Sequence, residues 1–501
     1  DVYENQELPI AASDVDCILL THAHIDHSGL IPLMYVNGFR GQVYSTSATA
    51  QLCEIMLRDS AHIQMFEAEW RNRKAARSGG KLKEFVPLYD MDAAVNVCKQ
   101  FVGCEYDRVY DIAEGIKIRF TDVGHLLGSA SIEVWATEKT ENGDVTEKIV
   151  FSGDIGNINK PIIKDPKHVR DADYVVMEST YGNRSHGGTP NYVEDLTDIF
   201  KRTFERGGNV VIPSFAVGRT QELLYIIRKI KEDNLVGRDF DVYMDSPLAI
   251  EATNIFIKNV ESCFDDDAVE LVRKGINPLS FPGLKYATTG DESKQINFDP
   301  NPKVIISSSG MCEAGRIRHH LKHNLWRPEC TIVFVGYQAV GTTGRIIVDG
   351  AEEIKLFGEP IQIKAEIVQL KGSSGHADKD GLLCWINAFD TKPKKVFVVH
   401  GEDSVCDEFT ECLKEEYGYD AMAPYTGGSY DLIADRVISE GVKERKTRRT
   451  TSTQRGKTVF DRLVAAGKRL MTVITHNEGG TNKDLAKFTD QINALCDKWD
   501  R

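Results

Sequence analysis

The sequence predicts an α/β fold with more than one domain. Short runs rich in β-branched residues recur along the chain, and each has the length and composition of a buried strand. Several are followed by stretches with apolar residues at helical spacing, such as residues 218–232. Strands that alternate with helices are typical of α/β proteins. A chain of 501 residues also exceeds the size at which a single hydrophobic core stops growing.

The composition excludes several classes of protein. Hydrophobic residues make up 41% of the chain and charged residues 27%, which is ordinary for a globular protein. No apolar run approaches the roughly 20 residues that a membrane span needs, and the acidic start is unlike a signal peptide. The 11 cysteines are scattered without a CxxC pair, which indicates reduced thiols and a cytoplasmic location. The net charge of -14 disfavours a general nucleic-acid coat but permits a local basic cleft.

The expected strands that stand out are residues 16–20, 148–151, 174–177, 209–212, 303–306 and 395–399. Residues 443–457 break the pattern, because they are basic, rich in Thr and poor in large apolar side chains. This stretch predicts an exposed linker, with RNA binding through its charges as the alternative. Beyond it, residues 460–474 and 484–499 predict a C-terminal helical hairpin.

The most specific motif follows the first strand, where His22, His24, Asp26 and His27 form the pattern H-x-H-x-D-H. In an extended segment, residues two apart point the same way, so His22 and His24 can reach one cation. Asp26 and His27 are directed toward a second position as the chain enters a helix. Imidazole nitrogens and carboxylate oxygens are ligands that suit Zn²⁺. The alternative, a set of surface histidines with Asp26 as a helix cap, does not account for their density.

Three further ligand candidates follow later strands: His125, Asp154 and His400. All are flanked by glycine, which lets the backbone approach a crowded site. A lone histidine at a strand end is more often structural than a ligand. Three such positions joined to the first motif nevertheless favour a metal centre.

Together these motifs resemble the metallo-β-lactamase fold and, within it, the β-CASP nucleases. Glu178, His376 and His400 match motifs A, B and C of that family, and the ordered match covers roughly residues 14–430. The likeness is to bacterial and archaeal relatives of the pre-mRNA 3′-end cleavage endonuclease subunit. It implies a metallo-β-lactamase αββα sandwich with an inserted β-CASP α/β domain and a short C-terminal helical extension.

The resemblance also divides the chain into parts. Residues 1–182 are expected to form the first part of the metallo-β-lactamase domain, residues 183–365 the β-CASP domain, and residues 366–435 the second part of the first domain. Residues 436–501 are expected to hold the basic linker and the helical hairpin. The family begins with two strands and an Asp-containing turn, whereas only about twenty residues precede His22. We therefore expect that N-terminal segment to be missing from this sequence.

A site with two Zn²⁺ ions is implied by the resemblance. One ion would be held by His22, His24 and His125, the other by Asp26, His27 and His400, with Asp154 as the bridge. Asp26 and Asp154 would orient the attacking water, His376 would act as general acid, and Glu178 would hold His376 in place. Within the family, histidine at motif C is typical of RNA-processing members, so His400 favours RNA over DNA.

Gly-rich turns in the inserted domain are candidates for phosphate binding. Each joins a strand to a helix or carries an arginine nearby, so that backbone N–H groups and a guanidinium could meet a phosphate. Each turn alone is weak evidence for phosphate binding, but the order of the three turns along the chain matches the family. The predicted substrate-binding residues are Ser214, Arg219, Ser309, Gly310, Arg316, Gly341 and Arg345.

The sequence therefore predicts a zinc-dependent ribonuclease, with endonuclease or 5′-exonuclease activity, that acts on single-stranded RNA in RNA processing or decay. We expect no membrane partner, and a homodimer is a further hypothesis. One alternative is a small-molecule (thio)ester or lactone hydrolase on the same metal fold, which needs neither the inserted domain nor Glu178 and His376. The other is a catalytically inactive RNA-binding subunit, which the intact ligand set argues against.

Overall fold

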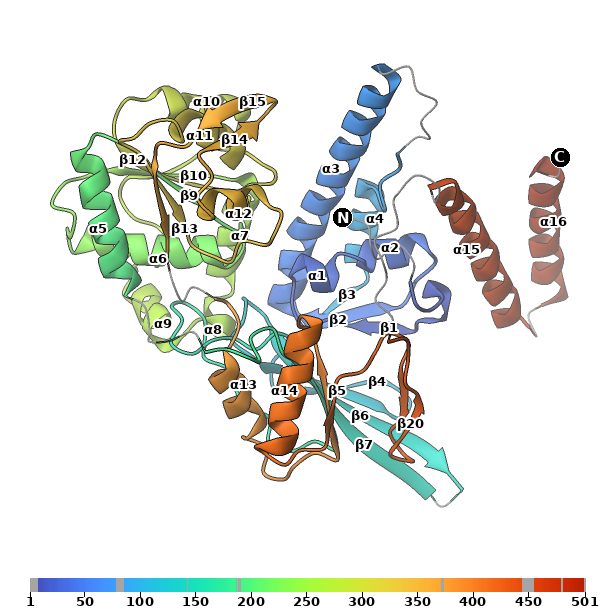
Figure 1. Ribbon diagram of the computed structural model, residues 1–501. Helices are drawn as coiled ribbons and strands as arrows, with labels where there is room; N and C mark the ends of the chain where they lie inside the picture. Colours follow the sequence, from blue (N-terminus) through green and yellow to red (C-terminus); the bar gives the residue numbers. More distant parts are fainter. Residues whose placement is uncertain are drawn as a thin grey trace.

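The computed structural model describes residues 8–77, 85–141, 143–185, 187, 191–370, 374–443, 455–478 and 481–499. The chain forms two lobes (Figure 1). The inserted residues make the green-to-yellow lobe, and the two flanking parts of the chain share the other. Most of the expected linker at 443–457 lies outside the described residues, as do residues 1–7.

A small parallel sheet, β1-β2-β3, lies on one side of the first lobe. Its strands are β1 (Cys17–Leu19), β2 (Gln42–Thr46) and β3 (Phe101–Cys104). Its helices are α1 (Ile25–Ser28), α2 (Ile31–Val36), α3 (Ser47–Arg77) and α4 (Met91–Cys98), and the turn η1 (Ala12–Asp14) precedes them. The Asp90 side chain accepts a hydrogen bond from the Ala93 N–H, which caps α4 at its start.

The second sheet of this lobe has the order β18-β17-β8-β7-β6-β5-β4. Helices α13 (Lys379–Ile386) and α14 (Asp403–Glu415) cover it, with Trp385 and Phe409 in the shared core. Two sheets with helices outside them make the expected αββα sandwich. The strands are β4 (Val109–Ala113), β5 (Ile116–Asp122), β6 (Ala130–Thr140), β7 (Gly143–Phe151), β8 (Tyr174–Glu178), β17 (Lys395–Val399) and β18 (Ala421–Met422), and a separate hairpin is formed by β19 (Ser429–Asp431) and β20 (Arg436–Ser439).

The inserted lobe is built on a parallel sheet of order β11-β10-β12-β9-β13-β16. Its central strands are buried at every residue, as expected when helices cover both faces. The strands are β9 (Val210–Pro213), β10 (Asp241–Asp245), β11 (Leu284–Tyr286), β12 (Lys303–Ser307), β13 (Thr331–Phe334) and β16 (Glu366–Gln369), with an antiparallel hairpin of β14 (Glu353–Leu356) and β15 (Glu359–Gln362). The helices are α5 (Tyr192–Glu205), α6 (Arg219–Glu232), α7 (Pro247–Lys258), α8 (Val260–Cys263), α9 (Asp266–Arg273), α10 (Gly290–Phe298), α11 (Ile317–Asn324) and α12 (Thr343–Val348).

The strands expected from the sequence are confirmed as β1, β7, β8, β9, β12 and β17. One expected boundary is wrong. The inserted domain was expected to end at residue 365, but β16 pairs in parallel with β13 from Thr331↔Glu366 to Phe334↔Gln369. Since β16 is an edge strand of the inserted sheet, that domain extends at least to Gln369.

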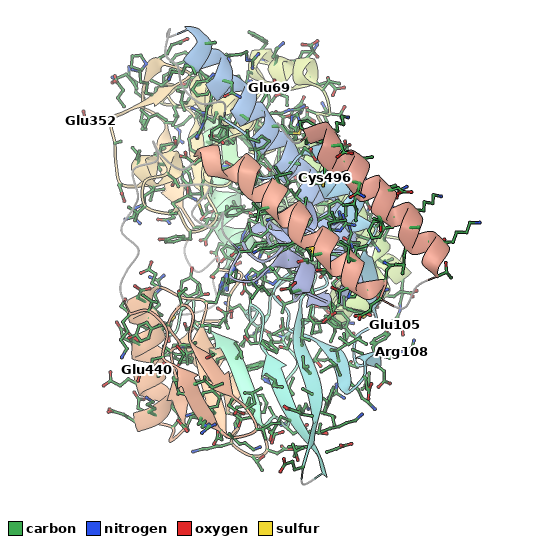
Figure 2. All side chains as sticks on the ribbon, turned by 90° about the vertical axis from the view of Figure 1, so that its right-hand side faces the viewer. Glu69, Glu105, Arg108, Glu352, Glu440 and Cys496 are labelled. Carbon is green, nitrogen blue, oxygen red and sulfur yellow. The ribbon has the colours of Figure 1, made fainter. Side chains whose placement is uncertain are left out.

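Two helices end the described chain, α15 (Arg455–His476) and α16 (Asn482–Trp499), close to the expected hairpin. In Figure 2 they lie in front of α3, with Cys496 labelled on α16. Most of their described side chains are exposed. Among the described residues, no helix combines the length and the apolar character needed to cross a membrane.

Sharp turns place ligand candidates at the ends of β5, β7 and β17. Gly124 and Gly153 precede His125 and Asp154 with φ of 65° and 59°, a region in which glycine is strain-free. His400 itself adopts φ 52° directly after β17. These turns bring side chains from three strands of one sheet toward the first motif, which follows β1 of the other sheet.

A glycine contact between two of these turns generates a prediction on stability. A Cβ built on Gly156 would lie 1.9 Å from the carbonyl oxygen of Gly124, so the loops that carry His125 and Asp154 touch backbone to backbone. Gly156→Ala should lower the free energy of unfolding by about 1–3 kcal/mol, because the two loops must separate. Gly290→Ala, where a Cβ meets nothing within 4 Å, is the matched control. Equal urea midpoints for the two variants would contradict this packing.

Candidate metal centre

The first motif occupies the turn between β1 and α1. His22 is buried three residues after the end of β1, His24 is the residue before α1, and Asp26 and His27 lie in the first turn of that helix. The Thr21 hydroxyl contacts His22 Nδ1 at 3.2 Å, which orients the ring with its Nε2 toward the centre of the cluster. The local chain path therefore directs His22 and His24 to one position.

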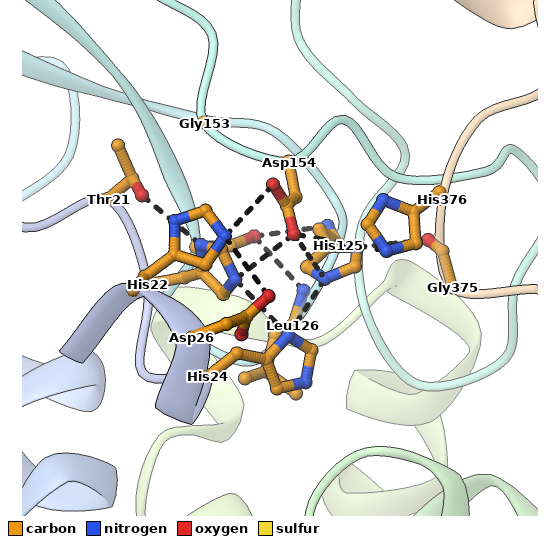
Figure 3. A network of polar contacts seen from close by, with 12 residues as sticks. Thr21, His22, His24, Asp26, His125, Leu126, Gly153, Asp154, Gly375 and His376 are labelled. Atoms are coloured by element: carbon orange, nitrogen blue, oxygen red, sulfur yellow. Dashed lines mark hydrogen bonds and ion pairs between the residues drawn. The ribbon is translucent and has the colours of Figure 1, made fainter. Parts of the chain in front are cut away.

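Asp154 lies at the centre of the cluster, with 2% of its side chain exposed (Figure 3). Its Oδ2 is 3.4 Å from His22 Nε2 and 3.5 Å from His125 Nε2. Its Oδ1 is 3.3 Å from His27 Nε2 and 3.4 Å from His400 Nε2. The two carboxylate oxygens thus face two different pairs of imidazoles.

The cluster divides into two groups of donor atoms. His22, His24, His125 and Asp154 form one, in which each donor atom lies within 4.8 Å of the others. His24 Nδ1 is 3.2 Å from His22 Nε2 and 3.1 Å from His125 Nε2. The second group consists of Asp26, His27 and His400. The structure thus brings together all seven residues predicted as metal ligands, in the two groups expected.

The electrostatics of the site match its geometry. Burial lowers the pKa of His22, and burial together with neighbouring imidazoles lowers the pKa of His24 and His125 well below the usual value. These rings are therefore neutral near pH 7, which is the form that binds metal. Burial opposes ionisation of Asp154, but the imidazoles that face its carboxylate, above all His22 and His27, outweigh burial and hold its pKa far below the usual range.

Two buried atoms indicate that the site fits a cation. His27 Nε2 and Asp154 Oδ1 have no hydrogen-bond partner among the described residues, although both are shielded from solvent. A buried polar atom without a partner costs free energy, which a bound cation would recover. His125 Nδ1 lies 3.1 Å from the Gly375 carbonyl, so this nitrogen carries the proton and Nε2 keeps its lone pair for a metal. Nitrogen and carboxylate donors of this kind fit zinc.

His376 and Glu178 form a pair beside Asp154. His376 Nδ1 is 3.2 Å from Glu178 Oε1, and His376 Nε2 is 3.9 Å from Asp154 Oδ2. Glu178 is buried and also accepts a hydrogen bond from the Ile155 N–H at 2.5 Å. Burial alone would lower the pKa of His376, but the Glu178 and Asp154 carboxylates outweigh it and raise that pKa. The geometry suits a histidine that donates a proton.

A cluster of charged side chains that the sequence did not predict links the two lobes next to the donor cluster. Lys160 donates to the His125 carbonyl at 3.1 Å and pairs with Glu222 of α6 at 3.2 Å. Arg219 pairs with the same Glu222 at 2.5 Å. These side chains are nearly buried, so the link holds the inserted lobe against the loop of a ligand candidate. Nothing in the spacing of Lys160 and Glu222 along the chain signals this contact.

Residues predicted to bind phosphate lie on the turns that follow β9, β12 and β13 or at the start of the helices after those turns. Arg219 is paired with Glu222, as described, and Arg345 pairs with Asp349 at 2.8 Å. Their role in phosphate binding stays a prediction, because it would require these ion pairs to rearrange or to be shared. The same applies to the remaining turn residues, Ser214, Ser309, Gly310 and Gly341.

The Arg316 side chain makes several hydrogen bonds within the protein that the sequence did not predict. Its guanidinium donates to buried Asp245 at 2.7 Å and to the carbonyl oxygens of Ala287 and Thr288 at 2.9 and 2.8 Å. Asp245 also contacts His320 Nε2 at 2.6 Å. Arg316 therefore braces the turn after β12, and contact with a phosphate remains a prediction for it as well.

Two family models match this chain. The Beta-Casp domain model matches residues 220–347. The model described as a Zn-dependent metallo-hydrolase RNA specificity domain matches residues 360–424. The first match falls in the inserted lobe, and the second spans the segment that carries His376 and His400.

Individual proteins match over a longer range. Ribonuclease TTHA0252 of Thermus thermophilus is 34% identical over 390 residues, which cover 78% of this chain and 82% of that protein. An RNase J-like protein of Methanocaldococcus jannaschii is 31% identical and covers 77% of this chain and 82% of its own length. Transcription termination factor FttA of Methanosarcina mazei is 32% identical, and the match covers 82% of this chain but 62% of FttA.

The motif order, the inserted parallel sheet and the donor cluster at the ends of four strands agree with these matches. The chain belongs to the β-CASP family of metallo-β-lactamase-fold metallohydrolases.

Proposed function

We propose that the protein is a metal-dependent ribonuclease that hydrolyses RNA phosphodiester bonds in RNA processing or decay. The observation that carries this proposal is the position of the His376–Glu178 pair beside Asp154, at the edge of the donor cluster. A metal cluster alone would serve many hydrolases, whereas an added proton donor suits a leaving group as poor as a ribose hydroxyl. The RNA specificity model and the ribonuclease relatives support RNA as the substrate.

The proposed cofactor is a pair of Zn²⁺ ions. His22, His24 and His125 would hold one, Asp26, His27 and His400 the other, and Asp154 would bridge them. Zinc bound there would supply Lewis acidity that lowers the pKa of a water molecule and balances negative charge on the phosphate. The stoichiometry of two is supported by the two oxygens of Asp154, which face different groups of donors.

The protein's own residues would then carry the proton transfers. Asp26 and Asp154 would accept hydrogen bonds from the attacking water and orient it toward the phosphorus. His376 would donate a proton to the departing ribose oxygen from Nε2, while its Nδ1–H stays bonded to Glu178. Glu178 would also keep the loop of Asp154 in place through the Ile155 N–H.

A turnover assay separates this function from its alternatives. The purified protein is given a labelled RNA, the DNA of the same sequence and an acyl ester, each with and without added Zn²⁺. A ribonuclease should cleave the RNA in a zinc-dependent manner and leave the ester intact. Hydrolysis of the ester alone would point to a small-molecule hydrolase, and RNA binding without turnover would point to an inactive RNA-binding subunit.

Metal content provides the first prediction for this site. Elemental analysis of the protein should give about two zinc ions per chain. His22→Ala and His400→Ala should each reduce that value by about one, since they belong to different donor groups. His168→Ala, an exposed histidine outside the cluster, is the control. A single tightly held ion after zinc supplementation would contradict the dinuclear arrangement.

The role of His376 is tested by its removal. His376→Ala should keep the zinc content and the affinity for RNA but lower kcat by roughly 10²–10⁴-fold, because the leaving oxygen receives no proton. A p-nitrophenyl phosphodiester, whose leaving group needs no proton, should be hydrolysed nearly as well as by the parent enzyme. If the variant loses zinc instead, His376 is a ligand or a structural residue.

The pH profile tests the role of Glu178. A general acid must be protonated, so activity should fall as pH rises through the pKa of His376. The Glu178 carboxylate raises that pKa, and Glu178→Gln should therefore move the alkaline limb of kcat to lower pH. The glutamine oxygen can still accept from the Ile155 N–H, so the loop is preserved. If the alkaline limb of the kcat profile does not move, the Glu178 carboxylate does not raise the pKa of the catalytic acid.

A further inference from the structure

Three turns of the inserted lobe lie together at the carboxyl ends of β12, β9 and β13, which are neighbours in the sheet. The Ser214 N–H donates to the Ser307 carbonyl at 3.0 Å. Gln338 is buried, and its Nε2 donates to the carbonyls of Gly310 and Gly336 at 3.0 and 3.3 Å. These bonds join the turns after the three strands into one surface.

Two aromatic rings project from this surface. Phe215 is 44% exposed and Tyr337 is 49% exposed. A Cβ built on Gly310 would lie 3.1 Å from the Phe215 ring, and one on Gly336 would lie 3.7 Å from it. The Phe215 ring therefore packs against the backbone of two glycines, and part of the ring stays exposed to solvent.

The surface continues toward the metal centre. The Phe215 carbonyl accepts from the Thr220 hydroxyl at 2.7 Å, which ties it to the first turn of α6. At the same turn, a Cβ on Gly218 would lie 3.1 Å from Leu126, the residue after His125. Phe215 and Gly218 are three residues apart, at most about 11 Å along the chain. A strand of RNA that crosses the metal centre would reach the rings within a few nucleotides.

We propose that Phe215 and Tyr337 form a stacking platform for unpaired bases of the RNA substrate. Flat aromatic faces bind bases of any identity, and two rings with few rotatable bonds lose little entropy when they do so. A paired base has both faces covered by its neighbours, so such a platform selects single-stranded RNA. This inference rests on the proposed function and adds a base-binding subsite to it.

Leucine replacements test the platform, because they keep the apolar volume and remove the aromatic face. In Phe215→Leu and Tyr337→Leu, KM for an unstructured RNA should rise roughly 5- to 150-fold per stacked base. Hydrolysis of a p-nitrophenyl phosphodiester should not change, since it does not reach the rings. Phe298→Leu removes a ring that is 76% exposed at the end of α10 and should match the parent enzyme. Phe215→Tyr keeps the face and should retain the parent KM.

RNAs that lack one base at a time locate the contact. The parent enzyme should cleave poorly when the missing base is the one that stacks, and Phe215→Leu should show no further loss at that position. The platform would be overturned if the loss of cleavage from removing the base and the loss from Phe215→Leu simply added. It would also be overturned if Phe215→Leu and Tyr337→Leu had the same KM as Phe298→Leu.

Different results would contradict the platform and the proposed function. A parent enzyme that hydrolyses neither RNA nor the p-nitrophenyl phosphodiester contradicts the proposed function. RNA affinity, measured by fluorescence anisotropy with the same RNAs and the zinc-loaded protein, still decides the platform in that case. Weaker binding by the two leucine variants but not by Phe298→Leu supports it, and equal binding by all of them overturns it.

Discussion

Asp154 has 2% of its side chain exposed, and four imidazole nitrogens from separate parts of the chain surround its carboxylate as possible donors to a cation. Removing water from a carboxylate costs several kcal/mol unless positive charge or hydrogen-bond donors replace it, and a cation held by these nitrogens would supply that charge. The turns after β1, β5, β7 and β17 must therefore meet at one point. The arrangement of both sheets of the sandwich follows from that requirement.

The inserted lobe is joined to this point rather than attached at a distance. Lys160 contacts the backbone of His125 on one side and Glu222 on the other, and Gly218 touches Leu126. A shift of the inserted sheet would therefore also move the loop that carries His125, a candidate metal ligand. These contacts fix the turns of the inserted lobe at a defined position relative to Asp154.

Much of the site could be predicted because its chemistry is local. The H-x-H-x-D-H motif places four donors within six residues, and His125, Asp154 and His400 lie within three residues after recognisable strands. Contacts set by tertiary packing could not be predicted. The Lys160–Glu222 pair, the bracing of Arg316 by Asp245 and the exposure of Phe215 depend on which turns meet in space. The end of the inserted domain was misplaced because β16 is a short edge strand with no break in composition before it.

If the donors around Asp154 support attack by water on the phosphodiester, oxygen from the solvent must enter the cleavage product. The zinc-loaded protein would cleave RNA in ¹⁸O-labelled water, and mass spectrometry would measure the masses of the products. Attack by water predicts heavy oxygen in the new terminal phosphate and continued cleavage when the ribose at the cut site lacks its 2′-hydroxyl. A 2′,3′-cyclic phosphate product, together with loss of cleavage in the 2′-deoxy substrate, would show that the ribose 2′-hydroxyl attacks the phosphorus instead of water.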